Sequence, residues 1–151
     1  MTSLRFSIDE ASTKQIELHL LACASAFRPP LDSRVSIPAY SAKLGSRATR
    51  HEAWAESALV GLVATYHGDA NQTAAFITNV SVHPDFQRRG IARRLIADAV
   101  RTASDVGMVS VDLEVDPAST PALELYAAIG FKDCGEPGTT RRMRLDLRTT
   151  P

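Results

Sequence analysis

The spacing of apolar residues in the first third of the chain predicts a strand followed by two helices. Leu4–Ile8 alternates apolar and polar positions, which is typical of a half-buried strand. Ala11–Phe27 repeats its apolar residues at helical spacing, and the proline pair that starts at Pro29 ends this pattern. Arg34–Ala48 predicts a loop and then a short helix, with Pro38 in its first turn.

Apolar residues recur at every second position in the middle of the chain, which predicts antiparallel strands. Three such segments follow one another along the chain, and they are His51–Glu56, Leu59–His67 and Ala75–Val82. A tight turn around Ser57 joins the first two segments. We therefore expect a meander, in which each strand pairs with the next.

The last third of the chain alternates between helical and strand patterns. One stripe of apolar residues at helical spacing ends at Gly107, which is typical of a helix C-cap. The elements predicted in this part of the chain are the helix Gly90–Val106, the strand Val109–Val115, the helix Thr120–Ile129 and the short strands Phe131–Cys134 and Arg141–Leu147. A strand, a helix and a strand in succession predict a right-handed parallel crossover. The fold class expected is α/β, with a mixed, mostly antiparallel sheet flanked by helices.

Composition limits the size and the class of the protein. The chain has 151 residues, 44% of them hydrophobic, and its 17 basic and 17 acidic side chains give no net charge. A chain of this size buries about 68% of its unfolded surface, enough for one core. We expect a single domain over residues 1–151 that binds no nucleic acid, since the whole chain lacks the basic charge that a polyanion attracts.

Signals for targeting and for metal binding are weak. Met1–Glu10 has no basic and then apolar pattern of a secretory signal, and the apolar stretch Ala58–Tyr66 is far shorter than the ~20 residues of a membrane span. Nothing places Cys23 and Cys134 together, which favours free thiols in a reducing compartment. The four histidines lack metal-ligand spacing. We expect a cytoplasmic protein with neither a membrane partner nor a metal.

The segment Val80–Arg94 carries the clearest chemical signal. A strand ends at Val82, and a loop then enters a helix with the small residues Gly90 and Ala92 at its start. The first N–H groups of a helix have no partner within it, and together with the helix dipole they form an anion site. Four arginines and no acid stand between positions 86 and 94, namely Arg88, Arg89, Arg93 and Arg94. These features predict a phosphate or pyrophosphate ligand.

Two motifs in this half of the chain resemble the Gcn5-related N-acetyltransferase (GNAT) superfamily. Gln87, Gly90 and Ala92 match the fixed positions of its pyrophosphate loop, Gln/Arg-x-x-Gly-x-Gly/Ala. The segment Ala122–Phe131 looks like a second signature of the family, Ala-x-x-Leu-Tyr-x-x-x-Gly-Phe. The resemblance covers roughly Leu59–Leu147, and the earlier residues agree only in the order of their elements.

The resemblance implies that acetyl-coenzyme A lies in a parallel splay between the strand that ends at Val82 and the strand from Val109. Main-chain groups of Val80 and Val82 would bind the pantetheine arm. Gln87 would lie at the loop entrance. The pyrophosphate would be held by the backbone N–H groups of Arg88, Arg89, Gly90, Ile91 and Ala92. Ser119 stands where the family usually has an asparagine that contacts the cofactor, so it offers a shorter side chain for that contact.

The chemistry implied is direct acyl transfer from a thioester to an amine. Tyr126 would sit near the sulfur and protonate the departing thiolate. An alkyl amine has a pKa near ~10.4 and must lose a proton before it attacks. The base stays open among Glu52, His83 and a water held by Asn79 and Ser81, because no acid occurs between Asp69 and Asp85.

The acceptor is less defined than the cofactor. In this family the segment Arg28–Ala48 would help to form the acceptor site, with Asp32, Arg34, Tyr40 and Lys43 as candidates. Trp54 is expected in the core or a wall, with lining of the acceptor site as the alternative. Arg141, Arg142 and Arg144 are expected on a solvated face, with a coenzyme A 3′-phosphate or an acidic partner as the alternatives. We expect a small-molecule primary amine as acceptor. The alternatives are a protein or peptide amine, and a non-catalytic acyl-coenzyme A-binding or regulatory domain. A homodimer also stays open.

Overall fold

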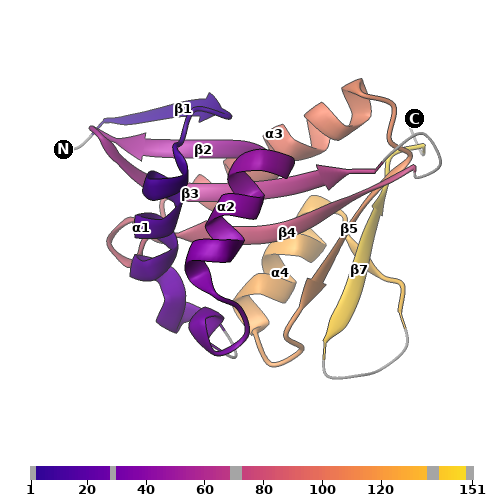
Figure 1. Cartoon of the computed structure of the whole chain (residues 1–151). Coiled ribbons are helices and arrows are strands. Elements are labelled where there is room, and N and C mark those ends of the chain that lie inside the picture. Colours follow the sequence, from indigo (N-terminus) through magenta and orange to yellow (C-terminus); the bar gives the residue numbers. More distant parts are fainter. Residues whose placement is uncertain (1–2, 28–29, 69–72, 136–139, 149–151) are drawn as a thin grey trace.

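One twisted sheet runs through the molecule in the computed structural model, which describes residues 3–27, 30–68, 73–135 and 140–148 (Figure 1). Its seven strands have the order β1-β2-β3-β4-β5-β7-β6. The strands are β1 (Leu4–Ile8), β2 (Thr49–Ala55), β3 (Ala58–His67), β4 (Ala74–Val82), β5 (Ser110–Val115), β6 (Lys132–Asp133) and β7 (Arg141–Asp146). Neighbours pair antiparallel except β4 and β5, which are parallel.

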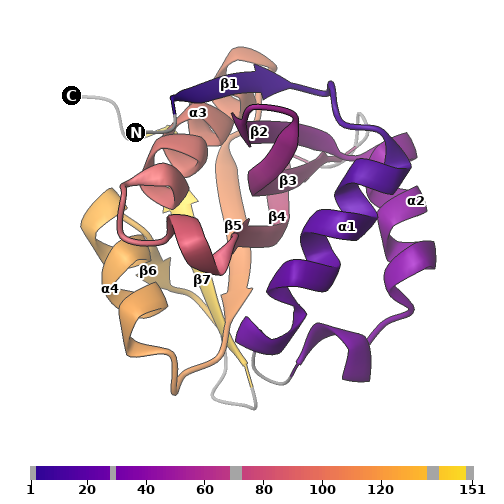
Figure 2. The ribbon, with the colours of Figure 1, turned by 90° about the vertical axis from the view of Figure 1, so that its left-hand side faces the viewer.

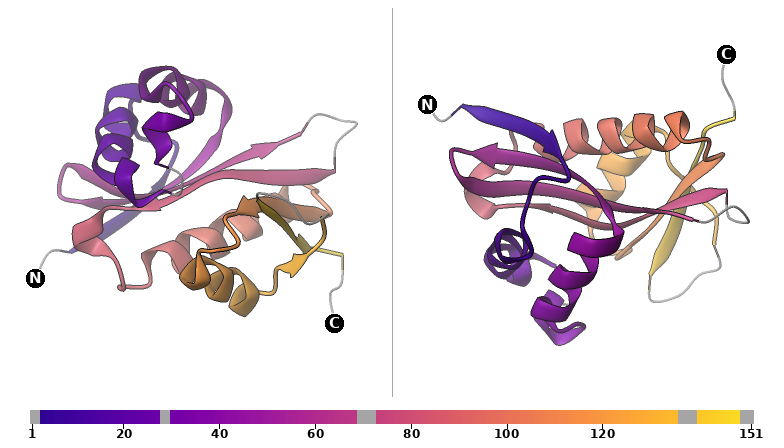
Figure 3. Two further views of the ribbon diagram at one scale, coloured as in Figure 1. Left: turned by 90° about the horizontal axis from the view of Figure 1, so that it is seen from below. Right: turned by 45° about the horizontal axis from the view of Figure 1, so that its top comes forward.

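Two helices cover each face of the sheet, as Figures 2 and 3 show. One face carries α1 (Thr13–Cys23) and α2 (Ile37–Arg47), and the other carries α3 (Ile91–Asp105) and α4 (Thr120–Ile129). Single 3-10 turns lie at Ala24–Ala26, Leu31–Ser33 and Pro84–Phe86. The predicted α/β class with a mixed sheet is confirmed, and each predicted element is present, although the pattern Ala11–Phe27 divides into α1 and a 3-10 turn.

Local signals in the sequence set the helix starts on the first face. The Ser12 side chain accepts a hydrogen bond from the Gln15 backbone, while the Gln15 side chain accepts one from the Ser12 backbone. This reciprocal capping box satisfies two N–H groups that a helix start otherwise leaves free. Ser36 caps α2 with a single bond, because its side chain accepts a hydrogen bond from the Ala39 N–H, and Pro38 occupies the first turn of this helix.

Each face of the sheet has its own apolar core. The core under α1 and α2 includes the fully buried residues Ile16, Leu20 and Leu44. The core under α3 and α4 includes Leu95 and Ile96. The central strands read as nearly continuous apolar runs because both of their faces are covered.

The feature of the fold that shapes the site is the divergence of β4 from β5. The two strands pair only from Ala74–Ile77 to Ser110–Leu113, so the second half of β4 has no partner on that side. Just past this point, at Thr78, β4 bulges out of its pairing with β3, which puts one extra residue into the strand. In Figure 1 the two strands separate in a V. The predicted parallel splay is therefore present.

The structure also bears on the expectations about membrane spans, cysteines and metal sites. Among the described helices, none combines the length and the apolar character that a membrane crossing requires. Cys23 is buried and Cys134 is exposed, and both thiols are free. Within the part of the chain that the structure describes, no group of three or more His, Cys, Asp or Glu side chains forms a metal cluster.

Candidate active site

The N-terminus of α3 is built to leave backbone N–H groups free. Gly90, its N-cap residue, has φ +76°, and Arg88 has φ +65°, so the loop turns sharply just before the helix. Gly90 supplies no side-chain cap, and the first turn contains no acid. The first backbone bond of the helix runs from Arg94 N to Gly90 O, which leaves the N–H groups of residues 91–93 without helical partners. An anion is the natural partner for this helix end.

A cavity of about 450 Å³, here called the α3 cavity, opens beside these N–H groups. Seven of the nine predicted cofactor-binding residues line it, namely Val80, Val82, Gln87, Arg88, Gly90, Ile91 and Ala92. Arg93 joins them from the first turn of α3. Arg89 instead stacks its guanidinium 5.0 Å from the Phe86 ring centre, outside the lining. The structure thus gathers most of the predicted loop around one cavity.

Main-chain groups of Val80 and Val82 face the gap between β4 and β5. The His83 N–H donates to the Val60 carbonyl oxygen on β3 at 2.8 Å, so His83 presents its main chain to β3. Orientation alternates along an antiparallel strand, and Val82 and Val80 therefore present their N–H and C=O groups to the opposite side. No strand pairs with them there, because β5 has already diverged.

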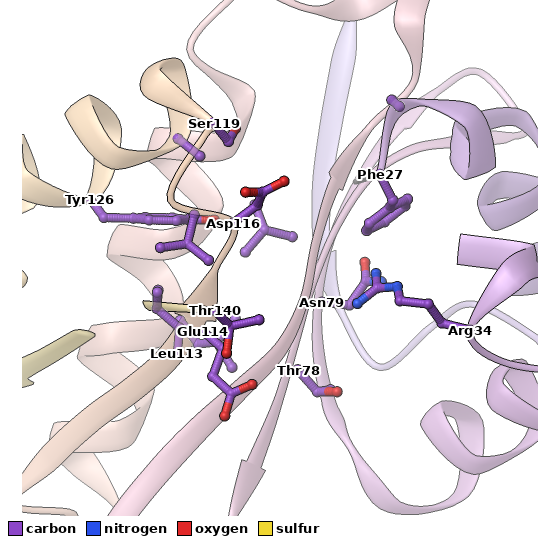
Figure 4. Close-up of a pocket in the computed structure, with 15 residues that line it drawn as sticks. Phe27, Arg34, Thr78, Asn79, Leu113, Glu114, Asp116, Ser119, Tyr126 and Thr140 are labelled. Carbon is purple, nitrogen blue, oxygen red and sulfur yellow. The ribbon is translucent and has the colours of Figure 1, made fainter. Parts of the chain in front are cut away.

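A second cavity of about 580 Å³, here called the splay cavity, lies in the widened gap between β4 and β5. Figure 4 shows Tyr126, Ser119 and Asp116 on one wall and Phe27, Arg34 and Asn79 on the other. Ser119 belongs to this cavity and is absent from the lining of the α3 cavity. The two cavities share Val80, Ala122 and Tyr126, so they meet beside these three residues.

Tyr126 projects from α4 toward this junction (Figure 4). Its side chain is 7% exposed and packs edge-on against Phe131, with ring centres 5.9 Å apart. Burial raises the pKa of its phenol to about 12, because the charged phenolate loses hydration there. The phenol therefore keeps its proton at any physiological pH and is available as a hydrogen-bond donor.

A carboxylate that the sequence interpretation missed lies in the splay cavity. Glu114, on β5, lines the cavity with a side chain that is 47% exposed, and Arg142 Nη1 lies 3.9 Å from its Oε1. Asp116 also lines the cavity, but it accepts a hydrogen bond from the Ala118 N–H and so holds its own turn. Strand alternation gives the signal for Glu114, since it stands between the apolar residues Leu113 and Val115.

The structure places Glu52, one of the predicted bases, in a structural role. The side chain is fully buried and accepts hydrogen bonds from Ser7 Oγ, the backbone of Glu10 and Ala11, and Arg50 Nε. It lines neither cavity described above, so the prediction of Glu52 as base is wrong. The Glu52 carboxylate instead joins β2 to Ser7 on β1 and to the residues just before α1.

The other predicted bases also have internal contacts. The His83 ring accepts the Asp85 N–H at 3.1 Å and lines neither cavity. Ser81 Oγ contacts both His19 and Asn79 at 2.8 Å. Asn79 lines the splay cavity while Ser81 lines the α3 cavity, so the two residues do not face a common space where they could hold a water.

The segment after α1 contributes in part as predicted. Arg34 lines the splay cavity, and the Tyr40 hydroxyl donates to the Thr78 carbonyl oxygen at 3.0 Å, beneath the cavity wall. Lys43 lies over the Tyr66 ring instead, and Asp32 is exposed and lines neither cavity. Arg28 lies outside the described residues. Trp54, at 3% exposure, belongs to the core, as predicted.

The arginines of β7 hold the sheet together beside the cavity. Arg144 makes a two-point contact with the buried Asp112 carboxylate at 2.7 and 2.9 Å, and Arg142 reaches the same group at 2.9 Å. These guanidinium groups lower the pKa of Asp112. Arg142 also lies over the Phe76 ring at 5.6 Å. Arg142 and Arg144 are thus partners of β5, and neither lines the α3 cavity.

A family model described as the acetyltransferase (GNAT) family matches residues 20–131. The chain belongs to this family, and the resemblance drawn from the loop and the Tyr126 motif is confirmed. The matched region contains the α3 loop, the splay and α4, which are the elements that form the two cavities.

Individual relatives agree with this assignment. A [Ribosomal protein bS18]-alanine N-acetyltransferase of Salmonella typhimurium is 37% identical over 59 residues, which is 39% of this chain and 40% of the relative. The matched region thus spans less than half of the length of this curated relative.

Solved structures of low sequence identity share the fold. The ribosomal-protein-S18-alanine N-acetyltransferase from Escherichia coli superimposes with a TM-score of 0.77 at 21% identity, over 99% of this chain and 97% of that one. The putative acetyltransferase yncA from Salmonella typhimurium, solved with its cofactor acetyl-CoA, gives 0.75 at 16% identity, over 96% and 95%.

Proposed function

We propose that the protein is an acetyl-coenzyme A-dependent N-acetyltransferase whose acceptor is the N-terminal amine of a protein or peptide. The observation that carries the proposal is the junction of two cavities at Val80, Ala122 and Tyr126. A transferase needs a donor site and an acceptor site that meet at the reacting atoms. Here the α3 cavity offers the donor site and the splay cavity the acceptor site.

The residues of the α3 cavity suit a coenzyme A thioester. The free N–H groups at the start of α3, with Arg88 and Arg93, would bind the pyrophosphate. Val80 and Val82 would bind the amide groups of the pantetheine arm as an added strand. The bound molecule supplies the thioester acetyl group, and a family neighbour solved with acetyl-CoA supports this choice.

Two observations favour an N-terminal amine over the small-molecule amine that the sequence suggested. The curated relative named above modifies an alanine of a ribosomal protein. The splay cavity also extends from Tyr126 to Phe27 and Arg34, which gives room for residues beyond the reacting amine. An α-amino group has a pKa of about 8, so a useful fraction is already neutral near pH 7.5, whereas an alkyl amine near ~10.4 is almost fully protonated.

The proton balance assigns roles to Glu114 and Tyr126. The acceptor ammonium gives one proton to Glu114 or, through water, to solvent, and the free amine attacks the carbonyl carbon. A β4 N–H near Val80 polarises the carbonyl oxygen. The C–S bond breaks as the C–N bond forms, and Tyr126 donates a hydrogen bond to the leaving sulfur. The second amine proton finally reaches the thiolate, which gives the acetylated amine and a free thiol.

Steady-state kinetics of two variants test this proposal. With an alanine-initiated peptide, Glu114→Gln and Tyr126→Phe are each expected to lower kcat about 10- to 1000-fold, while the KM for acetyl-coenzyme A changes little. Glu124→Gln and Tyr66→Phe are matched controls, because these side chains line neither cavity, and they should retain wild-type rates. An unchanged kcat in Tyr126→Phe would remove this residue from the reaction.

A panel of acceptors separates the candidate functions. Thiol release is expected to be faster with an alanine-initiated peptide than with polyamines or amino sugars, and faster rates with the small amines would reverse the acceptor assignment. A non-catalytic module would bind acetyl-coenzyme A and raise the melting temperature, yet release no thiol with any acceptor. The same assay with propionyl- and succinyl-coenzyme A defines the acyl preference.

A further inference from the structure

A buried polar chain connects α1 with the wall of the splay cavity. His19 on α1 is 3% exposed, and its Nε2 lies 2.8 Å from Ser81 Oγ on β4. Ser81 Oγ lies 2.8 Å from Asn79 Oδ1. On the other side of the ring, His19 Nδ1 lies 3.1 Å from the Leu59 carbonyl oxygen. The chain therefore runs from a backbone carbonyl, through an imidazole and a hydroxyl, to a side-chain amide.

The protons of this chain can be counted. A carbonyl oxygen only accepts, so the Leu59 contact requires a proton on His19 Nδ1. Burial lowers the pKa of His19 to about 4, and the ring is therefore neutral near pH 7, with a bare Nε2. Ser81 has one hydroxyl proton, and a bare Nε2 takes it. Ser81 then has no proton left for Asn79, and it can only accept from that residue.

The amide orientation in the structure does not match this count. There Ser81 donates to Asn79 Oδ1, which requires His19 to donate from both ring nitrogens as a cation. In addition, Asn79 Nδ2 is buried without a hydrogen-bond partner among the described residues. Burial raises the pKa of Tyr40 and its proximity to Asn79 opposes this rise, but the two side chains are not joined by a hydrogen bond of good geometry.

A half-turn of the Asn79 amide resolves both conflicts without a change of shape. Amide oxygen and nitrogen have nearly the same size, so the rotation only exchanges their positions. Nδ2 then donates to Ser81, Ser81 donates to His19 Nε2, and His19 Nδ1 donates to Leu59. The atom that the relay leaves free becomes the carbonyl oxygen Oδ1, a hydrogen-bond acceptor in a residue that is 3% exposed and lines the splay cavity.

We propose that Asn79 is a positioning residue for the acceptor, and that its Oδ1, held by the His19–Ser81 relay, accepts the backbone N–H that follows the reacting amine of a peptide. Val80 lines both cavities, but Asn79 lines the splay cavity and not the α3 cavity. Asn79 lies on the wall opposite Tyr126 (Figure 4). It would therefore contact the part of the peptide next to the reacting amine, and not the amine itself. This inference rests on the peptide acceptor proposed above.

The amide orientation is tested without any acceptor. Nitrogen-15 spectra of the full chain near pH 7 are expected to show His19 as the tautomer protonated on Nδ1. The Asn79 side-chain NH₂ protons should show nuclear Overhauser effects to the Ser81 β-protons and none to the Tyr40 ring. A ring protonated on Nε2, or NH₂ contacts to Tyr40, would overturn the relay.

The contact with the acceptor is tested by a cycle of two changes. One peptide carries an N-methyl group on the backbone nitrogen of its second residue, and it is compared with the unmodified alanine-initiated peptide. In the wild type, methylation is expected to raise the peptide KM about five- to tenfold with kcat nearly unchanged. Asn79→Ala should raise the KM of the unmodified peptide by a similar factor, leave the KM for acetyl-coenzyme A unchanged, and remove the effect of methylation.

The outcomes distinguish this inference from the proposed function. If methylation costs as much in Asn79→Ala as in the wild type, the two groups do not meet and the positioning role is overturned. If neither peptide is acetylated by the wild type, the proposed acceptor fails and the peptide contact fails with it, while the tautomer result still decides the amide orientation. Asn79→Ser replaces Asn79→Ala in the cycle if the alanine variant does not fold.

Discussion

Two buried polar side chains of this protein, Glu52 and His19, have different roles that their residue types alone do not reveal. Glu52 is a carboxylate at zero exposure, yet it joins the start of α1 to β2 and contacts Arg50 at 3.2 Å. Arg50 in turn donates to the carbonyls of Leu44 and Gly45 near the end of α2. A buried pair with this many hydrogen bonds is a structural joint. His19 is also buried, at 3% exposure, but it is neutral near pH 7 and belongs to a hydrogen-bonded chain that ends at Asn79 in the wall of the splay cavity.

The buried neutral state of His19 predicts a pH dependence of stability. Its folded pKa of about 4 lies below the ordinary histidine value of about 6.5, so the unfolded chain takes up the proton first as pH falls. Neutral His19 therefore contributes roughly 3 kcal/mol to the free energy of unfolding above pH ~6.5, and this contribution is lost as the pH falls toward ~4. Urea unfolding near pH 7 and near pH 4.5 measures it. His19→Gln should lose much less stability over this interval.

The comparison isolates His19 from other groups that titrate in the same range. Burial also lowers the pKa of His51 and of His67, and both histidines remain in the His19→Gln variant, as do all carboxylates. Their contributions cancel in the difference between the two proteins. Parallel stability curves for the wild type and the variant would show that His19 titrates normally in the folded chain.

At the scale of elements, alternation and caps predicted the strands and helices because those signals are local. The start of α4 at Thr120 and the whole of β1 agree with the pattern to the residue. The roles of Asp112 and Glu114 were not predictable in this way. Both stand on one face of β5, and only the pairing with β7 buries Asp112 against Arg144 while the divergence of β4 leaves Glu114 open. These pairings join segments far apart in the chain.

The packing of α3 on β3 depends on the absence of a side chain at Gly61. A Cβ there would lie 2.7 Å from Ile91 Cγ2 and 3.2 Å from Leu95 Cδ1. Ile91 is the first residue of α3, so Gly61→Ala is expected to displace the start of α3 and the loop Arg88–Gly90 that precedes it. We expect a loss of about 1–3 kcal/mol in unfolding free energy and several-fold weaker binding of coenzyme A, measured by denaturation and calorimetry.

A second glycine provides the control for this experiment. In Gly45→Ala the added Cβ would lie 2.9 Å from Thr13 Oγ1, between α1 and α2, on the opposite face of the sheet. Crowding there should leave the affinity for coenzyme A unchanged. Equal losses of affinity in the two variants would mean that general destabilisation, and not displacement of α3, weakens the cofactor site.

At the scale of the molecule, a net charge of zero coexists with two cavities whose local charges differ in sign. The α3 cavity has Arg88 and Arg93 in its lining and no acid, whereas the splay cavity has Glu114 and Asp116 with Arg34 on the far wall. The distribution fits an anionic donor on one side of Tyr126 and a cationic amine on the other. A balanced total therefore excludes an extended polyanion and still permits a compact phosphate ligand.

The salt dependence of coenzyme A binding tests this division of charge. Titration calorimetry near 0.05 M and near 0.5 M NaCl is expected to show weaker binding at high salt, because ions would screen the proposed contacts between the phosphates and these arginines. The double variant Arg88→Ala/Arg93→Ala should bind about tenfold or more weakly at low salt and respond less to added salt. Arg94→Ala is the matched control, since Arg94 is committed to Asp98 at 3.2 Å and to the Phe6 ring at 4.0 Å. If Arg94→Ala weakens binding as much as the double variant, the phosphate contacts are spread over the whole basic cluster and not confined to the two arginines that line the cavity.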